Sequence, residues 1–130
     1  MSISESAVTD FDRWIAEEFA TAGSFTVMVV LVSIEGIKVN PLCSTYFNVI
    51  GDDVDWAEIT VLFAGAGARW DGAAFFPMTA AEGGPLDNPS ARAKLREIEA
   101  RIDEDRLVLN EGNFFDKWGR RLMIEEAGLQ

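Results

Sequence analysis

The chain has 130 residues and a mass of 14.3 kDa, with 22 acidic side chains against 11 Lys and Arg and no histidine. This length predicts one domain, residues 1–130, and a content of 48% hydrophobic residues is enough to form a core. The absence of histidine excludes histidine-based catalysis and histidine metal ligands, and the single Cys43 excludes intrachain disulfides and thiolate zinc sites.

The formal net charge of −11 restricts the partners that the chain can bind. Nucleic acid and anionic membrane surfaces are disfavoured, because binding them needs Lys and Arg to neutralise phosphates. A negative surface steers basic proteins toward the chain, although it also serves solubility alone. Residues 1–9 lack the features of a secretory signal, and the longest apolar run, 27–32, is too short to span a bilayer. We therefore expect a cytoplasmic protein without membrane contact.

Apolar residues at three- and four-residue spacing predict an amphipathic helix near the start of the chain. Thr9 or Asp10 is its expected N-cap, and Gly23 stands where glycine commonly ends a helix. The apolar stripe consists of Phe11, Trp14, Ile15, Phe19 and Ala22. This stripe predicts which face of the helix packs against the rest of the molecule.

The segment that follows the first helix predicts the start of an antiparallel sheet. Residues 25–34 are apolar on both alternating faces, which is typical of a central strand that is covered on both sides. A tight turn at residues 35–36 leads to a short strand at 37–39. Pro41 then interrupts the ladder because proline has no N–H to donate, and a strand resumes at 44–50.

Two further strands are expected beyond an acidic turn. Residues 56–63 alternate, with Ile59, Val61 and Phe63 on one side, and so favour a strand. A fourth strand at 73–78 contains Pro77, which favours an edge position or an early end. Together with 25–34 and 44–50, these segments form an antiparallel meander of three to four strands.

The C-terminal part begins with a helix whose end the pattern leaves open. Asn88 as N-cap and Pro89 at the first position mark its start. Its apolar stripe consists of Ala91, Leu95, Ile98 and Ile102. Either the stripe extends to Leu109 or residues 106–109 form a short strand, and a helical turn at 113–118 precedes a strand or an irregular end. The order predicts an α+β fold: an N-terminal helix, the meander, then a C-terminal helical segment packed on the sheet.

A glycine-rich loop carries the first candidate site. Residues 63–72 include Gly65 and Gly67, but Trp70 stands where a dinucleotide-binding loop needs its third glycine, and no helix is expected to follow. The loop therefore favours a plain connection or a binding loop that displays Trp70. A tryptophan between Arg69 and Asp71 is typical of an interface anchor.

Two charged segments complete the candidate partner-binding residues. Asp52, Asp53 and Asp55 lie in a turn that lacks the spacing of a calcium loop, so no metal is expected and we assign them to the negative surface. Trp118 lies among basic side chains, which either contact an anion or an acidic partner face or balance nearby acids. These basic side chains are Lys117, Arg120 and Arg121.

The leading hypothesis is a small acidic module that binds a basic protein, such as an inhibitor, an immunity-type antagonist of a nuclease or toxin, or a phage-type accessory protein. No catalytic residue and no cofactor are assigned. A second hypothesis is a subunit of a symmetric homo-oligomer with Trp70 and Trp118 buried between copies. A third is a small enzyme or ligand-binding domain that uses a buried carboxylate, with Glu58 or Asp71 as the base.

Overall fold

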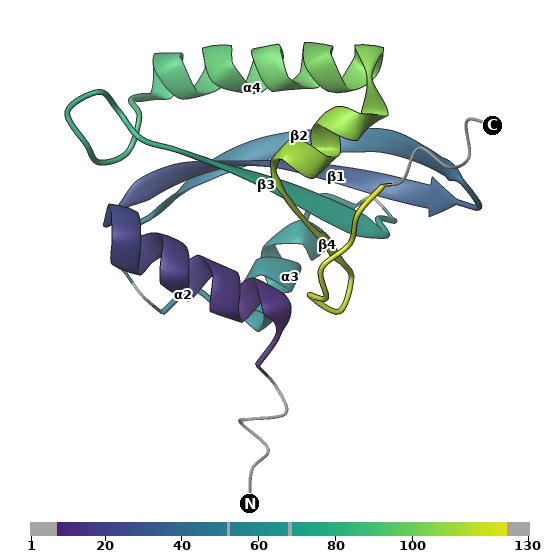
Figure 1. Cartoon of the computed structure of the whole chain (residues 1–130), viewed down its shortest axis with the longest axis horizontal. Helices are drawn as coiled ribbons and strands as arrows, with labels where there is room; N and C mark the ends of the chain where they lie inside the picture. Colours follow the sequence, from purple (N-terminus) through teal and green to yellow (C-terminus); the bar gives the residue numbers. More distant parts are fainter. Residues whose placement is uncertain (1–7, 52, 68, 125–130) are drawn as a thin grey trace, which may run out of the picture.

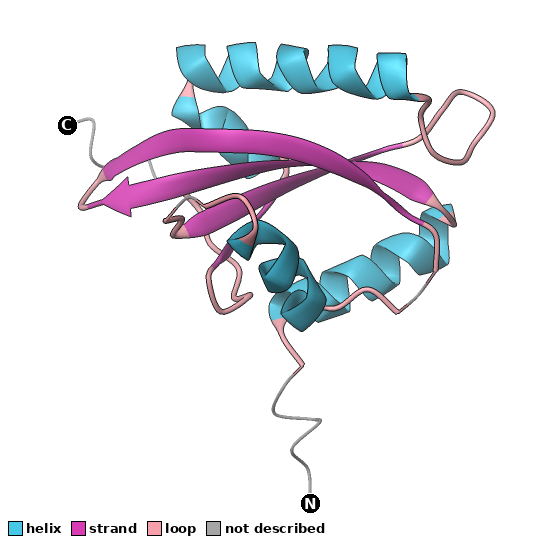
Figure 2. Cartoon of the chain, turned by 180° about the vertical axis from the view of Figure 1, so that it is seen from behind, coloured by secondary structure: helices cyan, strands magenta, loops and turns pink. Residues whose placement is uncertain are grey.

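A four-stranded antiparallel sheet in the order β2-β1-β3-β4 organises the chain, and helices cover both of its faces (Figures 1 and 2). The computed structural model describes residues 8–51, 53–67 and 69–124. The strands are β1 (Phe25–Glu35), β2 (Lys38–Val49), β3 (Gly72–Met78) and β4 (Asn113–Asp116). The helices are α2 (Asp10–Ala22), α3 (Trp56–Ala64), α4 (Asn88–Glu104) and the 3-10 helix η1 (Arg106–Glu111). The predicted α+β class, with an N-terminal helix and a later helix on the sheet, is confirmed.

The first helix begins and ends where the sequence predicts. Thr9 is the N-cap: its hydroxyl accepts from the Asp12 N–H at 3.0 Å, and the Asp12 carboxylate accepts from the Thr9 N–H at 2.9 Å. Gly23 ends α2 with a φ of 72°, a conformation that glycine adopts without a side-chain clash. The buried side chains of α2 include Phe11, Trp14 and Ile15.

Strand β1 lies inside the sheet and supplies both layers of the core. Val27, Val29 and Leu31 pack with the buried side chains of α2 and α3. Their neighbours on the opposite face, among them Val30, pack with α4 and η1. The expected central strand that is covered on both sides is therefore confirmed, and alternation of side chains along one strand explains why both layers are apolar.

Strand β2 is continuous, whereas two separate strands were expected. Leu31 pairs with Cys43 and the next residue, Val32, pairs with Pro41, so Leu42 is the extra residue of a β-bulge. The strand lies at the edge of the sheet, where a missing N–H costs no ladder bond if it faces outward. Pro41 is thus accommodated and does not end the strand.

The expected strand at residues 56–63 is wrong, because this segment forms helix α3. Its buried residues Trp56, Ile59 and Phe63 recur at three- and four-residue spacing, which fits a helix as well as Ile59, Val61 and Phe63 fit a strand. The Asp55 carboxylate decides the outcome locally, since it accepts from the Glu58 N–H at 2.9 Å as the N-cap.

Strand β3 forms as expected, but its neighbours differ from those of a simple meander. It pairs with β1 on one side and β4 on the other, because the chain segment with α3 carries it past β1. The residues of β3 that pair with β4 are 72–75. Pro77 therefore lies beyond the end of that ladder and neither ends β3 nor places it at the edge.

The secondary structure of the C-terminal segment, residues 87–116, differs from the alternatives that the sequence left open. Asp87, not Asn88, caps α4 by accepting from the Ser90 N–H at 2.8 Å. A 3-10 helix replaces the short strand considered at 106–109, and strand β4 occupies much of the helical turn expected at 113–118. Gly112 lets the chain approach β3 closely before β4 begins, since a Cβ there would lie 2.7 Å from the Phe75 carbonyl oxygen.

Candidate functional site

Trp70 extends the core beneath the sheet. Its ring lies 5.3 Å from that of Phe63 and 6.0 Å from that of Trp56, both in edge-to-face geometry. The residue is half-buried. Much of the Trp70 ring is therefore occupied by α3, although Arg69 beside it is exposed.

Asp71 links the sheet to the chain after β4. One carboxylate oxygen accepts from the Ile34 N–H at 2.8 Å, and the Asp71 N–H donates to the Val32 carbonyl at 2.8 Å. The other oxygen lies 3.8 Å from the Lys117 Nζ. Asp71 and Trp118 are both predicted site residues. The ion pair between Asp71 and Lys117 places Asp71 next to the turn that carries Trp118.

Trp118 lies on a tight turn, the Trp118 loop (residues 116–121), that closes a short hairpin after β4. Asp116 shapes this turn: its carboxylate accepts from the N–H groups of Trp118 and Arg120, each at 2.9 Å. The Trp118 side chain is 61% exposed. The Lys117 ammonium lies 5.6 Å and the Arg120 guanidinium 5.0 Å from its ring centroid, within the range of cation–π contact.

The Trp118 loop is held against α2. The Gly119 carbonyl accepts from the Phe11 N–H at 3.1 Å, and the Arg121 N–H donates to the Asp10 carboxylate at 2.9 Å. The bond from Arg121, followed by the side-chain bond from Arg13, lowers the pKa of Asp10 below its ordinary value. The exposed ring of Trp118 therefore stands on a fixed backbone.

Two of the cations around Trp118 already have carboxylate partners. Lys117 lies 3.8 Å from Asp71, and the Arg120 Nε lies 2.9 Å from the Asp116 carboxylate. Paired surface charges contribute little net field. This arrangement favours charge balance over the alternative of an anion site at Trp118.

Helix α3 exposes apolar side chains as well as burying them. Val61 is 74% exposed and Leu62 is 62% exposed. The outward side of the helix, here called the α3 surface, consists of Ala57, Glu58, Val61, Leu62 and Ala64. A surface helix ordinarily carries polar residues on its outward side, so an apolar one indicates a contact surface.

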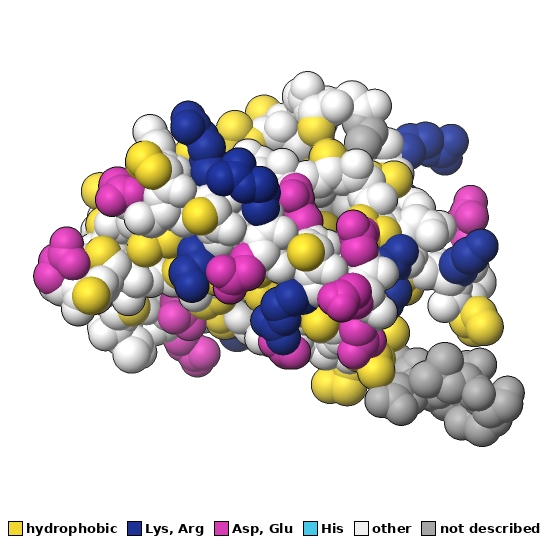
Figure 3. Space-filling model, turned by 90° about the horizontal axis from the view of Figure 1, so that it is seen from above, with side chains coloured by type: hydrophobic (Ala, Val, Ile, Leu, Met, Phe, Trp, Pro, Cys, Tyr) yellow, Lys and Arg dark blue, Asp and Glu magenta, His cyan; other side chains and the backbone are white. Residues whose placement is uncertain are grey.

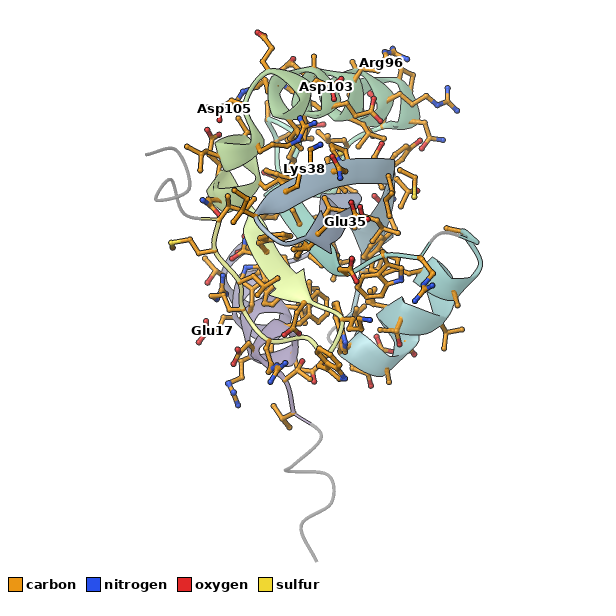
Figure 4. The ribbon with its side chains drawn as sticks, turned by 90° about the vertical axis from the view of Figure 1, so that its right-hand side faces the viewer. Glu17, Glu35, Lys38, Arg96, Asp103 and Asp105 are labelled. Atoms are coloured by element: carbon orange, nitrogen blue, oxygen red, sulfur yellow. The ribbon has the colours of Figure 1, made fainter. Side chains whose placement is uncertain are left out.

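Carboxylates lie at the N-terminal end of the α3 surface. Asp53 and Asp55 are exposed just before the helix, and Glu58 is exposed in its first turn. Asp52 lies outside the described residues. Helix α2 also carries more acids than bases, namely Asp10, Asp12, Glu17 and Glu18 against Arg13, but Glu17 lies on the side of α2 that faces away from α3 (Figure 4). The space-filling view from the α4 side shows instead a mixture of basic and acidic side chains (Figure 3).

Sequence reasoning missed Val61 and Leu62 because a strand assignment placed them on alternating faces of a sheet. A signal for the helix is present in the sequence. Asp55 is followed three residues later by Glu58, a spacing typical of a helix start.

The described residues line open cavities away from the α3 surface, of which two are considered for a ligand. One, of about 270 Å³, lies between α2 and the Trp118 loop and is lined by Asp10, Arg13, Trp14, Glu17 and Arg121. The other, of about 210 Å³, lies between β2 and α4 and includes Leu42, Cys43 and Glu99 in its lining. Neither cavity borders Glu58 or Asp71, the carboxylates considered as catalytic bases.

In the described part of the chain, no three acidic or cysteine side chains gather closely enough to hold a metal ion. No helix in the same part has the length and apolar character needed to cross a bilayer. Comparison of the chain with protein-family models, curated proteins and solved structures finds no match.

Proposed function

We propose that the chain is a protein-binding module that recognises a basic protein through the α3 surface. The observation that supports this most strongly is the exposure of Val61 and Leu62 side by side on a helix whose opposite side is already buried. Residues 61 and 62, with Glu58 one turn earlier, form a continuous patch. Such a patch loses unfavourable contact with water when a partner covers it.

The apolar pair supplies affinity. Full burial of a Val or Leu side chain contributes about 1.5–3 kcal/mol relative to exposure. Two such anchors, surrounded by contacts that exclude water, match the common pattern in which few residues carry most of the binding energy. Helix α3 is fixed on the core by Trp56, Ile59 and Phe63, so little conformational entropy is lost when the anchors are covered.

The surrounding charge determines the partner. Asp53, Asp55 and Glu58 flank the apolar pair with carboxylates, and the whole chain carries a formal charge of −11. A basic partner is steered toward such a surface, and like charge disfavours acidic proteins. These features suit an antagonist of the inhibitor or immunity type that acts on a basic nuclease or toxin.

The Trp118 loop adjoins the start of α3 and extends the same contact region. The Trp56 Nε1 donates to the Lys117 carbonyl at 3.1 Å, which joins the first residue of α3 to the loop. Figures 1 and 4 both show α3 and the chain after β4 close together. Trp118 then adds an exposed aromatic ring on a loop that is joined to the first residue of α3.

The test is capture of proteins from a lysate of the source cells with three immobilised chains, compared by quantitative mass spectrometry. These are the wild type, the double variant Val61→Ser with Leu62→Ser, and the control variant Ile37→Ser. Ile37 is 86% exposed at the β1–β2 turn, so the control removes a similar apolar surface elsewhere.

The proposal predicts a basic protein that the wild type and the Ile37→Ser chain retain at low salt. The double variant loses it, and high salt releases it from all chains. Equal capture of the same proteins by the double variant and the wild type would contradict the proposal.

A further inference from the structure

The cavity of about 210 Å³ between strand β2 and helix α4 lies on the face of the sheet opposite α3. Val30 and Ile102 line its floor, and both side chains are almost completely buried. Pro41 and Leu42 add an apolar wall from β2. A ligand in this cavity therefore meets hydrocarbon on two sides.

The β-bulge in β2 lies at this cavity. Leu42 is the extra residue of the bulge, and Pro41 beside it pairs with Val32 of β1. A bulge bends its strand and re-aims the neighbouring side chains, and bulges are frequent beside active sites. The irregularity of β2 thus falls at the point where the strand and α4 leave room for a ligand.

Contacts on both sides of the bulge hold the cavity in shape. Toward one end of β2, the Tyr46 hydroxyl lies 3.4 Å from the Asn88 side-chain oxygen. Toward the other end, the Arg106 Nε donates to the Val39 carbonyl at 2.9 Å, and the same guanidinium donates to the Ile102 carbonyl. A preformed cavity loses little conformational entropy when it is filled.

Two carboxylates of α4 line the remaining side of the cavity. Glu99 and Asp103 are four residues apart, so they lie one turn apart on the same side of the helix. The Ser44 hydroxyl donates to Glu99, and Figure 4 shows Asp103 on α4, above strand β2. Among the described residues, no Lys or Arg lines the cavity or forms an ion pair with either carboxylate. The cavity therefore combines an apolar floor with two carboxylates whose charge is not balanced by an ion pair.

We propose that this cavity binds a protonated amine or guanidinium at the end of an aliphatic chain. The chain lies on Val30, Leu42 and Ile102, and the cation lies between Glu99 and Asp103. Lys and Arg side chains have this construction, an apolar stem with a charged head, and so does a free alkylamine. Charge-assisted hydrogen bonds to the carboxylates stabilise the cation. Because the α3 surface lies on the other face of the sheet, this proposal and the proposed function stand or fail separately.

The first test is an NMR titration of the isotope-labelled full chain with pentylamine at constant ionic strength. Pentylamine is protonated at neutral pH, as a lysine side chain is. We expect saturable shifts of the Val30, Leu42 and Ile102 methyl signals, with half-saturation at about 1–10 mM. Pentanol and pentanoate carry the same chain without the positive charge and should bind about tenfold or more weakly. No saturable shift with pentylamine, or equal binding of the three compounds, would overturn the proposal.

A matched pair of double variants tests the carboxylates. Glu99→Gln with Asp103→Asn removes both charges at the cavity, and Glu97→Gln with Glu104→Gln removes two charges elsewhere on the same helix. Both variants should keep the circular dichroism of the wild type, because all four side chains are exposed. The affinity for pentylamine should fall about tenfold or more in the first variant and stay within about twofold in the second. Equal affinities of the two folded variants would refute a role for these carboxylates.

A blocked amino acid distinguishes the two sources of the cation. Nα-acetyl-lysine N-methylamide carries a lysine side chain on a neutral piece of main chain, which can stay outside an open cavity. We expect it to shift the same methyl signals with at least the affinity of pentylamine, which assigns the cavity to a lysine or arginine of a protein. Shifts with pentylamine alone would assign the cavity to a free amine, and shifts with neither compound would overturn the proposal.

Discussion

The Asp12 carboxylate of α2 accepts a hydrogen bond from the backbone N–H of Trp56, the first residue of α3, at 2.8 Å. Its other oxygen accepts from the Thr9 N–H and completes the capping box of α2. One side chain thus satisfies donors at the starts of two helices. This contact fixes the α3 surface relative to α2 and its acidic side chains.

Replacement of Asp12 by Ala should lower the free energy of unfolding by about 1–3 kcal/mol, because two N–H groups lose their acceptor. Asp12→Asn keeps one amide oxygen and should show a smaller loss. Urea denaturation measures both values. The matched control is Glu17→Ala on the exposed side of α2, with an expected change within about 0.5 kcal/mol. An equal cost for Asp12→Ala and Glu17→Ala would contradict this role.

Gly119 should tolerate no side chain. Its φ is 79°, and a Cβ there would lie 2.9 Å from the Thr9 Cβ. Gly119→Ala should lower the free energy of unfolding by about 2–3 kcal/mol, since strain and a clash add. Gly36→Ala isolates the strain, because Gly36 has a φ of 64° with no atom within 4 Å of the added Cβ. Thermal unfolding of both variants distinguishes the two costs; a larger cost at Gly36 would show that the Thr9 contact is unimportant.

The sequence predicts an element of the fold correctly where its hydrophobic pattern fits only one type of secondary structure. In α2 the N-cap, the apolar stripe and Gly23 all indicate the same helix. The sequence of β1 fits a strand and does not fit a helix. The 56–63 segment fits both periods, and the capping signal of Asp55 followed by Glu58, which the structure shows as a hydrogen bond, separates the helix from the strand. Strand β4 is four residues long and is set by its pairing with β3, a long-range contact that no local pattern reveals.

The candidate site was predicted in part for the same reason. Trp118 is exposed on a polar turn, as its glycine and charged neighbours suggest. Trp70 has similar neighbours in sequence, yet it packs on Trp56 because α3 folds back beneath it. The α3 surface follows from the helix assignment, and so it was out of reach once a strand was expected.

Asp87 should make the stability of α4 depend on pH. Its pKa is lowered by the Ser90 backbone N–H and then by the Ser90 hydroxyl. A lowered pKa in the folded state means that the stabilisation is present above the unfolded pKa of ~3.9 and is lost as pH falls through the folded value. Asp87→Asn keeps a capping oxygen without titrating, so its unfolding free energy should fall less below about pH 4. Identical pH profiles for the variant and the wild type would contradict this.

The α3 surface should be dispensable for folding. Val61→Ser with Leu62→Ser should change the free energy of unfolding by no more than about 1 kcal/mol, because both side chains are largely exposed. Chemical denaturation checks this value. A loss of several kcal/mol would mean that these side chains support the core and are not reserved for a partner.

The most direct test of the account is hydrogen–deuterium exchange of the chain alone and bound to the basic protein that it captures. The account predicts slower exchange in residues 56–64 of the complex, with a smaller effect at residues 117–121, because α3 is the centre of the contact. The β2 edge should keep the exchange of the free chain. Unchanged exchange across α3, with protection confined to another surface, would contradict the claim that α3 binds the partner.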